Sequence, residues 1–178
     1  MSQSFSGVLL AAGAGTRYGK PKVLADDGRW LRACVAALAN GGCHEVVVVL
    51  GAAVVEVPAP ARAVVAPDWA SGLSASVRAG IEAVDADYAV LHAIDTPDVG
   101  ADAVRRVLDA ARSSRSGLAR AHYGDRPGHP VVIARRHWPD LVSGLHGDEG
   151  ARPFLAGRTD VIAVDCADLA SGQDIDSR

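Results

Sequence analysis

The sequence predicts an α/β fold of the three-layer α/β/α, Rossmann-like kind, with a mostly parallel, partly mixed sheet. Two apolar runs, Val8–Ala12 and Glu45–Leu50 with its four consecutive valines, are typical of strands buried on both faces. Hydrophobic residues recur at helical spacing between these two runs. Strands that alternate with helices usually form a parallel sheet covered by helices on both sides.

The other elements follow in the same alternation. The first helix carries its apolar stripe on Trp30, Leu31, Cys34, Val35 and Leu38, and Asn40-Gly41-Gly42 ends it. Two further apolar stripes predict helices around residues 73–84 and 104–111. Short apolar runs bounded by Gly, Pro, Asp or charge predict further strands at residues 62–66, 88–94, 118–123, 131–134 and 161–164.

Length and composition fit one soluble domain. The chain has 178 residues, of which 49% are hydrophobic and 22% charged, so we expect a single domain over residues 1–178. No apolar run approaches the roughly 18 residues of a membrane span, and no membrane association is expected. The polar start, residues 1–6, has no Lys or Arg before the first apolar run, which predicts a cytoplasmic protein.

Charge and cysteine content exclude several partners. The net charge of −3 gives no positive field for a polyanion, so nucleic acid is not an expected partner. Cys34, Cys43 and Cys166 are an odd number without C-x-x-C spacing, and this predicts buried thiols instead of a disulfide framework or a zinc site.

A glycine-rich loop follows the first predicted strand. In open α/β sheets, ligands bind beyond the carboxyl ends of the strands. Residues 13–22 contain three glycines and both lysines of the chain, Lys20 and Lys22. Glycines let backbone N–H groups approach a phosphate closely, and cations neutralise its charge. A phosphate site is therefore favoured over a solvated turn.

Two common phosphate-binding loops do not match these residues. A P-loop requires glycine where this chain has Ala14, and Ser or Thr where it has Pro21. A dinucleotide-binding loop requires its third glycine one residue before Gly19 and an acid after the second strand, which instead ends at Leu50-Gly51. The loop is thus of neither the kinase nor the dehydrogenase type.

An acid stands at the end of another predicted strand. Residues 88–94 run directly into Asp95-Thr96-Pro97-Asp98. One or two carboxylates, with substrate phosphates, suffice to hold Mg²⁺. Asp95 alone could equally cap the next helix, but with the glycine-rich loop facing it the sequence favours a metal ligand.

The loop and the acid together resemble a known superfamily. The pattern Leu10-Ala11-Ala12-Gly13-x-Gly15-Thr16-Arg17-x-Gly19-x-x-Lys22 resembles the signature loop of nucleotidyltransferases that load a nucleoside triphosphate onto a phosphorylated acceptor. The resemblance implies a fold of the nucleotide-diphospho-sugar transferase type, and catalysis by Arg17, Lys22 and Asp95. The loop residues implied to contact the nucleotide are Leu10, Ala11, Ala12, Gly13, Ala14, Gly15, Thr16, Arg17 and Lys22.

Further segments are similar to the molybdenum cofactor cytidylyltransferases. Residues 66–77 closely resemble their Asn-Pro-x-Trp-x-x-Gly-x-Ser-x-Ser segment, which implies nucleotide contacts from Gly72, Leu73 and Ser74. Ser74 is also placed to cap a helix. Residues 126–130 resemble Arg-Gly-His-Pro with Pro127 inserted, and residues 147–152 resemble Gly-Asp-x-Gly-Ala-Arg. The acceptor contacts implied are His129, Asp148 and Arg152, although a histidine in such a turn is more often structural.

The carboxyl-terminal segment supplies a second candidate metal ligand. Asp174-Ile175-Asp176 resembles the start of the family's Asp-Ile-Asp-Thr-Pro motif, which makes Asp176, or Asp174, a metal ligand beside Asp95. Ser177-Arg178 stand where the motif has Thr-Pro, and Ile94 stands where the family usually has Gly before the acid.

The resemblance implies a reaction. The enzyme would use Mg²⁺ to move CMP from CTP to the phosphate of molybdopterin cofactor, release pyrophosphate, and make transient contact with a molybdenum enzyme. Four alternatives stay open: a guanylyltransferase, a sugar-phosphate nucleotidyltransferase, a non-catalytic cofactor escort, and a structural partner with a degenerate site. Ile94 and the departure after Asp176 favour the escort.

Overall fold

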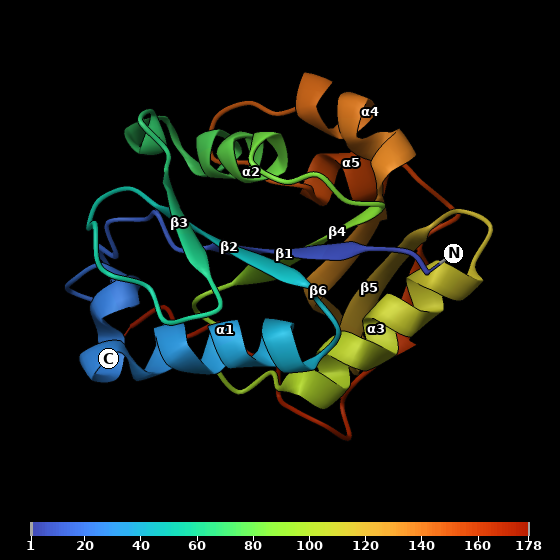
Figure 1. Cartoon of the computed structure of the whole chain (residues 1–178), viewed down its shortest axis with the longest axis horizontal. Coiled ribbons are helices and arrows are strands. Elements are labelled where there is room, and N and C mark those ends of the chain that lie inside the picture. Colours follow the sequence, from blue (N-terminus) through green and yellow to red (C-terminus); the bar gives the residue numbers. More distant parts are fainter. Residues whose placement is uncertain (1, 178) are drawn as a thin grey trace.

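A mixed sheet forms the centre of the protein. The computed structural model describes residues 2–177, and these residues form a seven-stranded sheet in the order β3-β2-β1-β4-β6-β5-β7 (Figure 1). Strands β1, β2, β3 and β4 are parallel, whereas β6 runs antiparallel to both β4 and β5. The predicted class, mostly parallel and partly mixed, is confirmed.

The elements alternate along the chain as predicted. The strands are β1 (Phe5–Leu10), β2 (Glu45–Leu50), β3 (Arg62–Val65), β4 (Tyr88–Ala93), β5 (Leu118–Tyr123), β6 (Arg126–Ala134) and β7 (Ile162–Asp165). The α-helices are α1 (Arg29–Asn40), α2 (Leu73–Glu82), α3 (Ala101–Ser113), α4 (Trp138–Ser143) and α5 (Arg152–Ala156). Short 3₁₀ turns lie at Lys22–Gly28, Trp69–Ser71 and Arg135–His137.

Helices cover both faces of the sheet and enclose a hydrophobic core on each. Helices α1 and α3 lie on one face, and α2, α4 and α5 lie on the other (Figure 1). Side chains of successive strand residues alternate between these faces, so Leu9 joins the α1 side while Val8 and Leu10 join the α2 side. This burial on both faces explains why the central strands are continuous apolar runs.

One strand is longer than the sequence analysis predicted. Strand β6 begins at Arg126, five residues before the predicted start at Val131, so the segment around His129 is a strand and not a turn. Pairing with β5 at Tyr123↔Arg126 extends it across a tight turn at Gly124, whose φ is +68°. The two prolines and the glycine in this segment conceal the strand, because they lack the β-branched pattern that identifies one.

Three further differences are local. Helices α4 and α5 have 6 and 5 residues, too few to show a helical period in the sequence. The predicted cap of α2 by Ser74 is wrong, because Gly72 occupies the N-cap position with a φ of +115°. Ser74 lies inside the first turn, and its hydroxyl donates to the Gly147 carbonyl oxygen at 2.7 Å.

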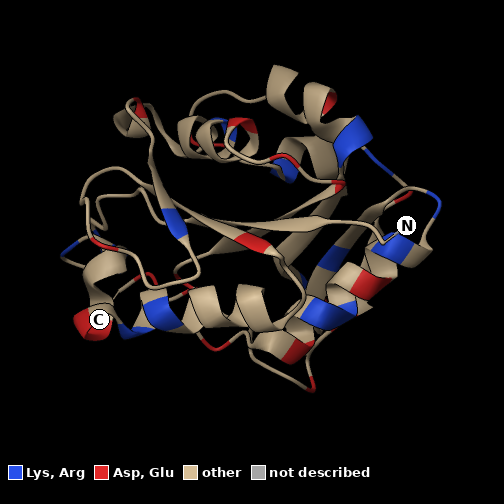
Figure 2. Ribbon diagram, in the orientation of Figure 1, with Lys and Arg blue, Asp and Glu red and all other residues tan. Residues whose placement is uncertain are grey.

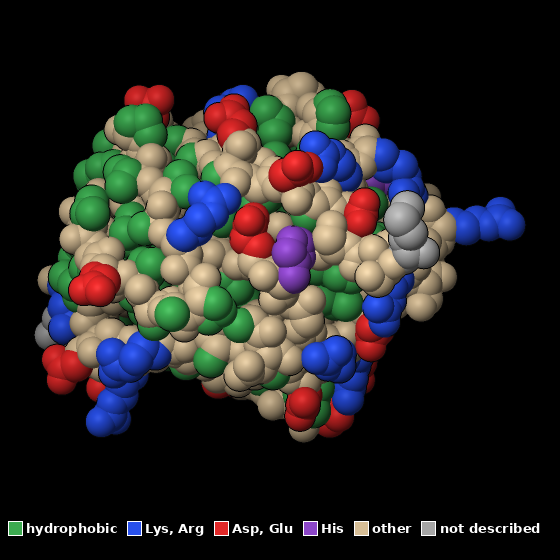
Figure 3. All heavy atoms as spheres, in the orientation of Figure 1, with side chains coloured by type: hydrophobic (Ala, Val, Ile, Leu, Met, Phe, Trp, Pro, Cys, Tyr) green, Lys and Arg blue, Asp and Glu red, His purple; other side chains and the backbone are tan. Residues whose placement is uncertain are grey.

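The surface carries both signs of charge in mixture. Basic and acidic residues alternate along α3 in the coloured ribbon of Figure 2, and charged side chains of both signs lie among hydrophobic ones on the face shown in Figure 3. All three cysteines are buried and unpaired, as predicted, and burial raises the pKa of Cys34 and of Cys43 to about 12. Within residues 2–177, every helix is too short or too polar to cross a bilayer.

Candidate active site

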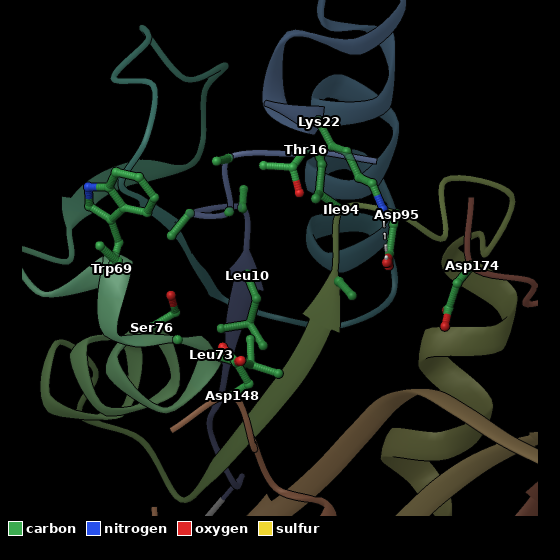
Figure 4. A pocket seen from close by; sticks show the side chains of 18 of the residues that line it. Leu10, Thr16, Lys22, Trp69, Leu73, Ser76, Ile94, Asp95, Asp148 and Asp174 are labelled. Atoms are coloured by element: carbon green, nitrogen blue, oxygen red, sulfur yellow. Dashed lines mark ion pairs between the residues drawn. The ribbon is translucent and has the colours of Figure 1, made fainter. Parts of the chain in front are cut away.

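A cavity of about 660 Å³ opens where β1 and β4 end, beside the start of α2 (Figure 4). Its wall comes from parts of the chain that are distant in sequence: the end of β1 with the glycine-rich loop, the start of α2, the end of β4, strand β6, the loop before α5 and the carboxyl-terminal segment. The lining residues are Leu10, Ala11, Ala12, Gly13, Ala14, Gly15, Thr16, Lys22, Trp69, Ala70, Gly72, Leu73, Ser76, Ala93, Ile94, Asp95, His129, Asp148 and Asp174.

The glycine-rich loop is shaped by two different uses of glycine. Gly15 adopts a φ of +66°, and a Cβ at this position would lie 1.9 Å from the Lys20 carbonyl oxygen, so no other residue fits without moving the backbone. A Cβ on Gly13 would meet no atom within 4 Å. Gly15 thus folds the loop tightly on itself, while the surface at Gly13 stays open to a ligand.

Lys22 and Asp95 meet at one end of the cavity. The Lys22 Nζ lies 3.5 Å from Asp95 Oδ2 and 3.4 Å from Asp176 Oδ1 (Figure 4 shows the first pair). Trp69 lies at the opposite side of the view from this ion pair. The cavity therefore has a charged end suited to phosphates and an aromatic side.

Negative charge gathers around Asp95. The Ile175 N–H donates to the Asp95 carbonyl oxygen at 2.9 Å, which fixes the carboxyl-terminal segment beside β4 and brings Asp174 and Asp176 near the Asp95 carboxyl. Burial raises the pKa of Asp95, and the charge of Asp174 raises it further, while Lys22 lowers it. A cation bound here would offset this charge.

These carboxylates suit a magnesium ion. Among residues 2–177, no three His, Cys, Asp or Glu side chains are already arranged as a metal cluster. Mg²⁺ does not need one, because it binds through one or two carboxylates and completes its shell with water and substrate phosphates. Asp95, with either Asp174 or Asp176, meets that requirement.

A second loop closes the cavity against α2. A Cβ on Gly72 would lie 2.4 Å from the Gly147 carbonyl oxygen and 2.5 Å from Asp148 Oδ1, so the absence of a side chain at Gly72 lets this loop pack directly on the helix start. The Ser74 hydroxyl and backbone N–H both donate to the same Gly147 oxygen, at 2.7 and 3.1 Å. Together these contacts place Asp148 at the edge of the cavity.

A smaller cavity of about 380 Å³ adjoins the first. Leu10, Leu73, His129 and Asp148 line both, so the two share a wall. The other residues of the second cavity are Val77, Leu91, Arg120, Val131, Glu149, Gly150, Ala151, Arg152 and Leu155. Burial and the charge of Arg120 lower the pKa of His129 to about 4, so this imidazole is neutral at physiological pH.

The structure brings together most, but not all, of the residues that the sequence indicated. Lys22, Asp95 and the loop from Leu10 to Thr16 share the first cavity, and His129, Asp148 and Arg152 share the second. Three predicted residues lie outside the walls of both cavities: Arg17 is exposed, Ser74 is turned toward Gly147, and Asp176 reaches the site only through Lys22.

Several residues of the cavities were not predicted as contacts, and Trp69, Ser76 and Arg120 are three of them. Trp69 and Ser76 line the first cavity, and both belong to a motif that the sequence analysis had already quoted. Arg120 lines the second cavity from the middle of β5. In the sequence, Arg120 is marked only as a charged residue inside a predicted strand. Candidate site residues were sought in the loops that follow strands, so Arg120 was missed.

Comparison with known proteins gives the family. The profile of the MobA-like NTP transferase domain matches residues 7–162, which include most of β1, all of β2 to β6 and the glycine-rich loop. The chain belongs to this family. As a MobA-like protein it is a nucleotidyltransferase, and the sequence-based assignment to this superfamily is confirmed.

Individual relatives of this MobA-like chain cover nearly its whole length. It is 40% identical over 97% of its residues, and 92% of the relative, to the nicotine blue oxidoreductase of Paenarthrobacter nicotinovorans. The crystal structure of Rv0371c from Mycobacterium tuberculosis H37Rv superposes with a TM-score of 0.80 at 28% identity, over 99% of this chain and 95% of that one. A complex of Rv0371C with manganese matches at 26% identity and a TM-score of 0.70, over 92% and 88% of the two chains.

Proposed function

We propose that this MobA-like nucleotidyltransferase moves CMP from CTP to the terminal phosphate of molybdopterin, forming molybdopterin cytosine dinucleotide and pyrophosphate. One observation carries the proposal: the glycine-rich loop, Lys22 and Asp95 line one cavity, and a second cavity shares its wall. The first has the charges that a triphosphate needs. The second offers a place for the acceptor beside it.

The reaction needs no protein nucleophile. An oxygen of the acceptor phosphate forms a bond to the α-phosphorus of CTP, while the bond from that phosphorus to the bridging oxygen breaks and its electron pair leaves with pyrophosphate. The second pKa of a phosphate ester is about 6, so the attacking oxygen is already mostly deprotonated at neutral pH. The protein therefore contributes positioning and charge neutralisation.

Individual side chains divide this work. Lys22 sits at the charged end of the cavity, where its ammonium group can exchange a carboxylate partner for phosphate oxygens. Backbone N–H groups of the loop around Gly13 and Gly15 would surround the triphosphate. Arg17, exposed beside this loop, would join only by turning inward when the nucleotide binds.

A divalent cation completes the charge balance. Mg²⁺ would be held by Asp95 with Asp174 or Asp176, and when bound it supplies charge stabilisation for the phosphates. Support comes from the negative charge that Asp174 and Asp176 add beside Asp95 and from the manganese complex of Rv0371C.

The choice of base and acceptor rests on the sequence motifs. Ala12 follows Leu-Ala, where guanylyltransferase relatives usually have Gly, and residues 128–130 read Gly-His-Pro. Both features resemble the cytidylyltransferases. The proposal places the enzyme in the cytoplasm as one catalytic domain that passes its product to a molybdenum enzyme, without binding nucleic acid or membrane.

Pyrophosphate release tests the proposal directly. CTP and GTP are each supplied with Mg²⁺, with and without molybdopterin cofactor. Release from CTP that depends on the cofactor is the expected result. Release from GTP would reverse the base assignment, and CTP binding without release would favour an escort role or another acceptor.

The nicotine blue oxidoreductase relative favours a second candidate, an oxidoreductase that acts on nicotine blue, for which we test a nicotinamide dinucleotide as the electron donor. The loop lacks the dinucleotide-binding spacing, and β2 ends at Leu50-Gly51 without a ribose-binding acid. Loss of NAD(P)H absorbance in the presence of nicotine blue, with no pyrophosphate release in the first assay, would establish this alternative. The first assay follows the release of pyrophosphate and the second follows the oxidation of NAD(P)H, so together they separate the two candidates.

A further inference from the structure

Arg120 occupies an unusual position for a cation. It lies in the middle of β5, paired in register with Val131, on the sheet face that carries the core around α2 and α4. The side chain is partly buried and lines the second cavity. Its Nε–H donates to the Gly128 carbonyl oxygen at 3.1 Å, and within residues 2–177 its four other N–H groups have no hydrogen-bond partner.

Neither arginine of this cavity has a carboxylate partner. Within the described chain, no acidic oxygen lies within 4.0 Å of Arg120 or Arg152, whereas Arg106 and Arg158 have partners at 2.7 and 2.8 Å. Burial lowers the pKa of Arg120, and the positive charge of Arg152 lowers it further. Arg152 is exposed, so the cost of this like charge falls on the partly buried Arg120, and an anion bound between the two guanidinium groups would offset it.

We propose that Arg120 and Arg152 together bind the attacking phosphate of the acceptor at the junction of the two cavities. This inference rests on the proposed function for the identity of the acceptor, and it adds Arg120 as an acceptor-binding residue. A guanidinium presents parallel N–H donors that match phosphate oxygens, so two of them form a clamp. The Arg120 Nε–H donates to the carbonyl oxygen of Gly128, the residue before His129, and His129 lines both cavities, so Arg120 lies beside the shared wall.

The rest of the cavity fits a flat organic group with polar edges. Leu91, Val131 and Leu155 provide apolar surface for a ring system. Asp148 and Glu149 also line this cavity, but both are exposed, and water screens their charge. Their carboxylates can accept from N–H groups of a ring. The cavity therefore suits an acceptor that joins a phosphate to a ring with polar edges.

Titration calorimetry with molybdopterin cofactor alone tests the clamp. Arg120→Met and Arg152→Met should each weaken cofactor binding about ten- to hundredfold, because each removes charge-assisted hydrogen bonds, while the Kd for CTP stays unchanged. Arg78→Met is the matched control: Arg78 is also a partly buried arginine that donates to carbonyl oxygens, and it lines neither cavity. In turnover, the arginine variants should raise the KM for the acceptor more than that for CTP. Cofactor binding by Arg120→Met at the wild-type Kd would overturn the inference.

A second readout works even where the acceptor is not molybdopterin or Arg120→Met does not fold. Phenyl phosphate is titrated into wild-type protein, and the Arg120 Nε–H resonance, identified by its loss in Arg120→Lys, is followed by NMR. It should shift to saturation with phenyl phosphate and not with phenol, and Arg152→Met should weaken that response. If the Arg120 Nε–H resonance does not shift with phenyl phosphate, the proposed phosphate site at Arg120 and Arg152 is wrong. A shift in a protein that neither binds nor turns over molybdopterin would keep the clamp and reject the proposed function.

Discussion

The two cavities differ in whether their cationic side chains have carboxylate partners. In the first, Lys22 contacts Asp95 and Asp176 at 3.5 and 3.4 Å, so its charge is already compensated within the protein. In the second, Arg120 and Arg152 have no acidic partner among the described residues. The two cavities share a wall. The difference indicates two modes of phosphate binding.

A compensated cation must exchange partners when its ligand binds. Lys22 can leave the carboxylates for phosphate oxygens, and the freed carboxylates would then suit a divalent cation that arrives with the nucleotide. Arg120 and Arg152 have no carboxylate partner to give up, so an anion can bind between them without any exchange of partners. The first cavity is therefore expected to depend on metal, and the second on the charge of the acceptor alone.

The largest effect on turnover is expected when the Asp95 carboxylate, which balances the charge of Lys22, is removed. Asp95→Asn removes a negative charge that both Lys22 and the metal would contact. The activation barrier should therefore rise by about 3 kcal/mol, and turnover should fall on the order of a hundredfold. The measurement is the kcat for pyrophosphate release at saturating Mg²⁺. Asp168→Asn, which breaks the exposed ion pair with Arg106, is the control and should leave the rate unchanged. Near-normal turnover in Asp95→Asn would mean that this carboxylate holds no metal.

Two glycine variants separate the folding of the first cavity from its binding. Gly15→Ala should lower the free energy of unfolding by about 2 kcal/mol or more, because its φ is +66° and its Cβ would overlap the Lys20 carbonyl oxygen. Gly13→Ala should change stability by less than about 0.5 kcal/mol, since its Cβ enters open space, but that methyl group should weaken CTP binding. Urea unfolding and CTP titration of both variants provide the check. Equal stability of the two variants would contradict the conformation described for this loop.

Acid should destabilise the fold through the buried side chain of His92. His92 is fully buried next to His129, with their ring centroids 6.4 Å apart, and neither of its ring nitrogens has a hydrogen-bond partner among residues 2–177. Burial and the charge of His129 lower the pKa of His92 to about 3, against a smaller opposing effect of Asp98. Above the unfolded pKa of about 6.5, both states are neutral and nothing is lost. As the pH falls below this value, the unfolded chain takes up the proton that the fold excludes, so stability declines.

A variant measures this contribution. Between about pH 8 and about pH 5, His92 should cost about 2 kcal/mol of stability, and His92→Leu should remove that part of the decline. The comparison of the two pH values within each protein cancels any change in packing. If the decline is the same in both proteins, His92 is already charged in the fold.

The smallest effect concerns the link between the cavities. Ser74→Ala removes one hydrogen bond to the Gly147 carbonyl oxygen but leaves the backbone N–H bond in place, so a loss of about 1 kcal/mol in stability is expected. Because the hydroxyl holds the loop of Asp148, the KM for the acceptor should rise while that for CTP stays constant. A selective rise in the KM for CTP would instead support the direct nucleotide contact implied by the sequence motif.

Elements with a strong local pattern were predicted well. Strands β2 and β5 have the bounds that the sequence indicated, and α1 ends at Asn40 before its glycines. The start of β6 was missed because Pro127, Gly128 and Pro130 suppress the pattern, and only pairing with β5 makes this segment a strand. Lys22 and Asp95 were found because each stands in a loop at the end of a strand, whereas Arg120 was missed because it stands inside one.

The sequence by itself determined the fold class, the glycine-rich loop and the family, because each depends on the order and spacing of residues along the chain. Tertiary structure alone decided which charges have partners. It joined Lys22 to Asp176 across most of the chain, turned Ser74 toward Gly147 and left Arg120 beside Arg152 without an acid. Electrostatic interactions depend on the distance between charges and on their burial, and the spacing of residues along the chain determines neither of these quantities.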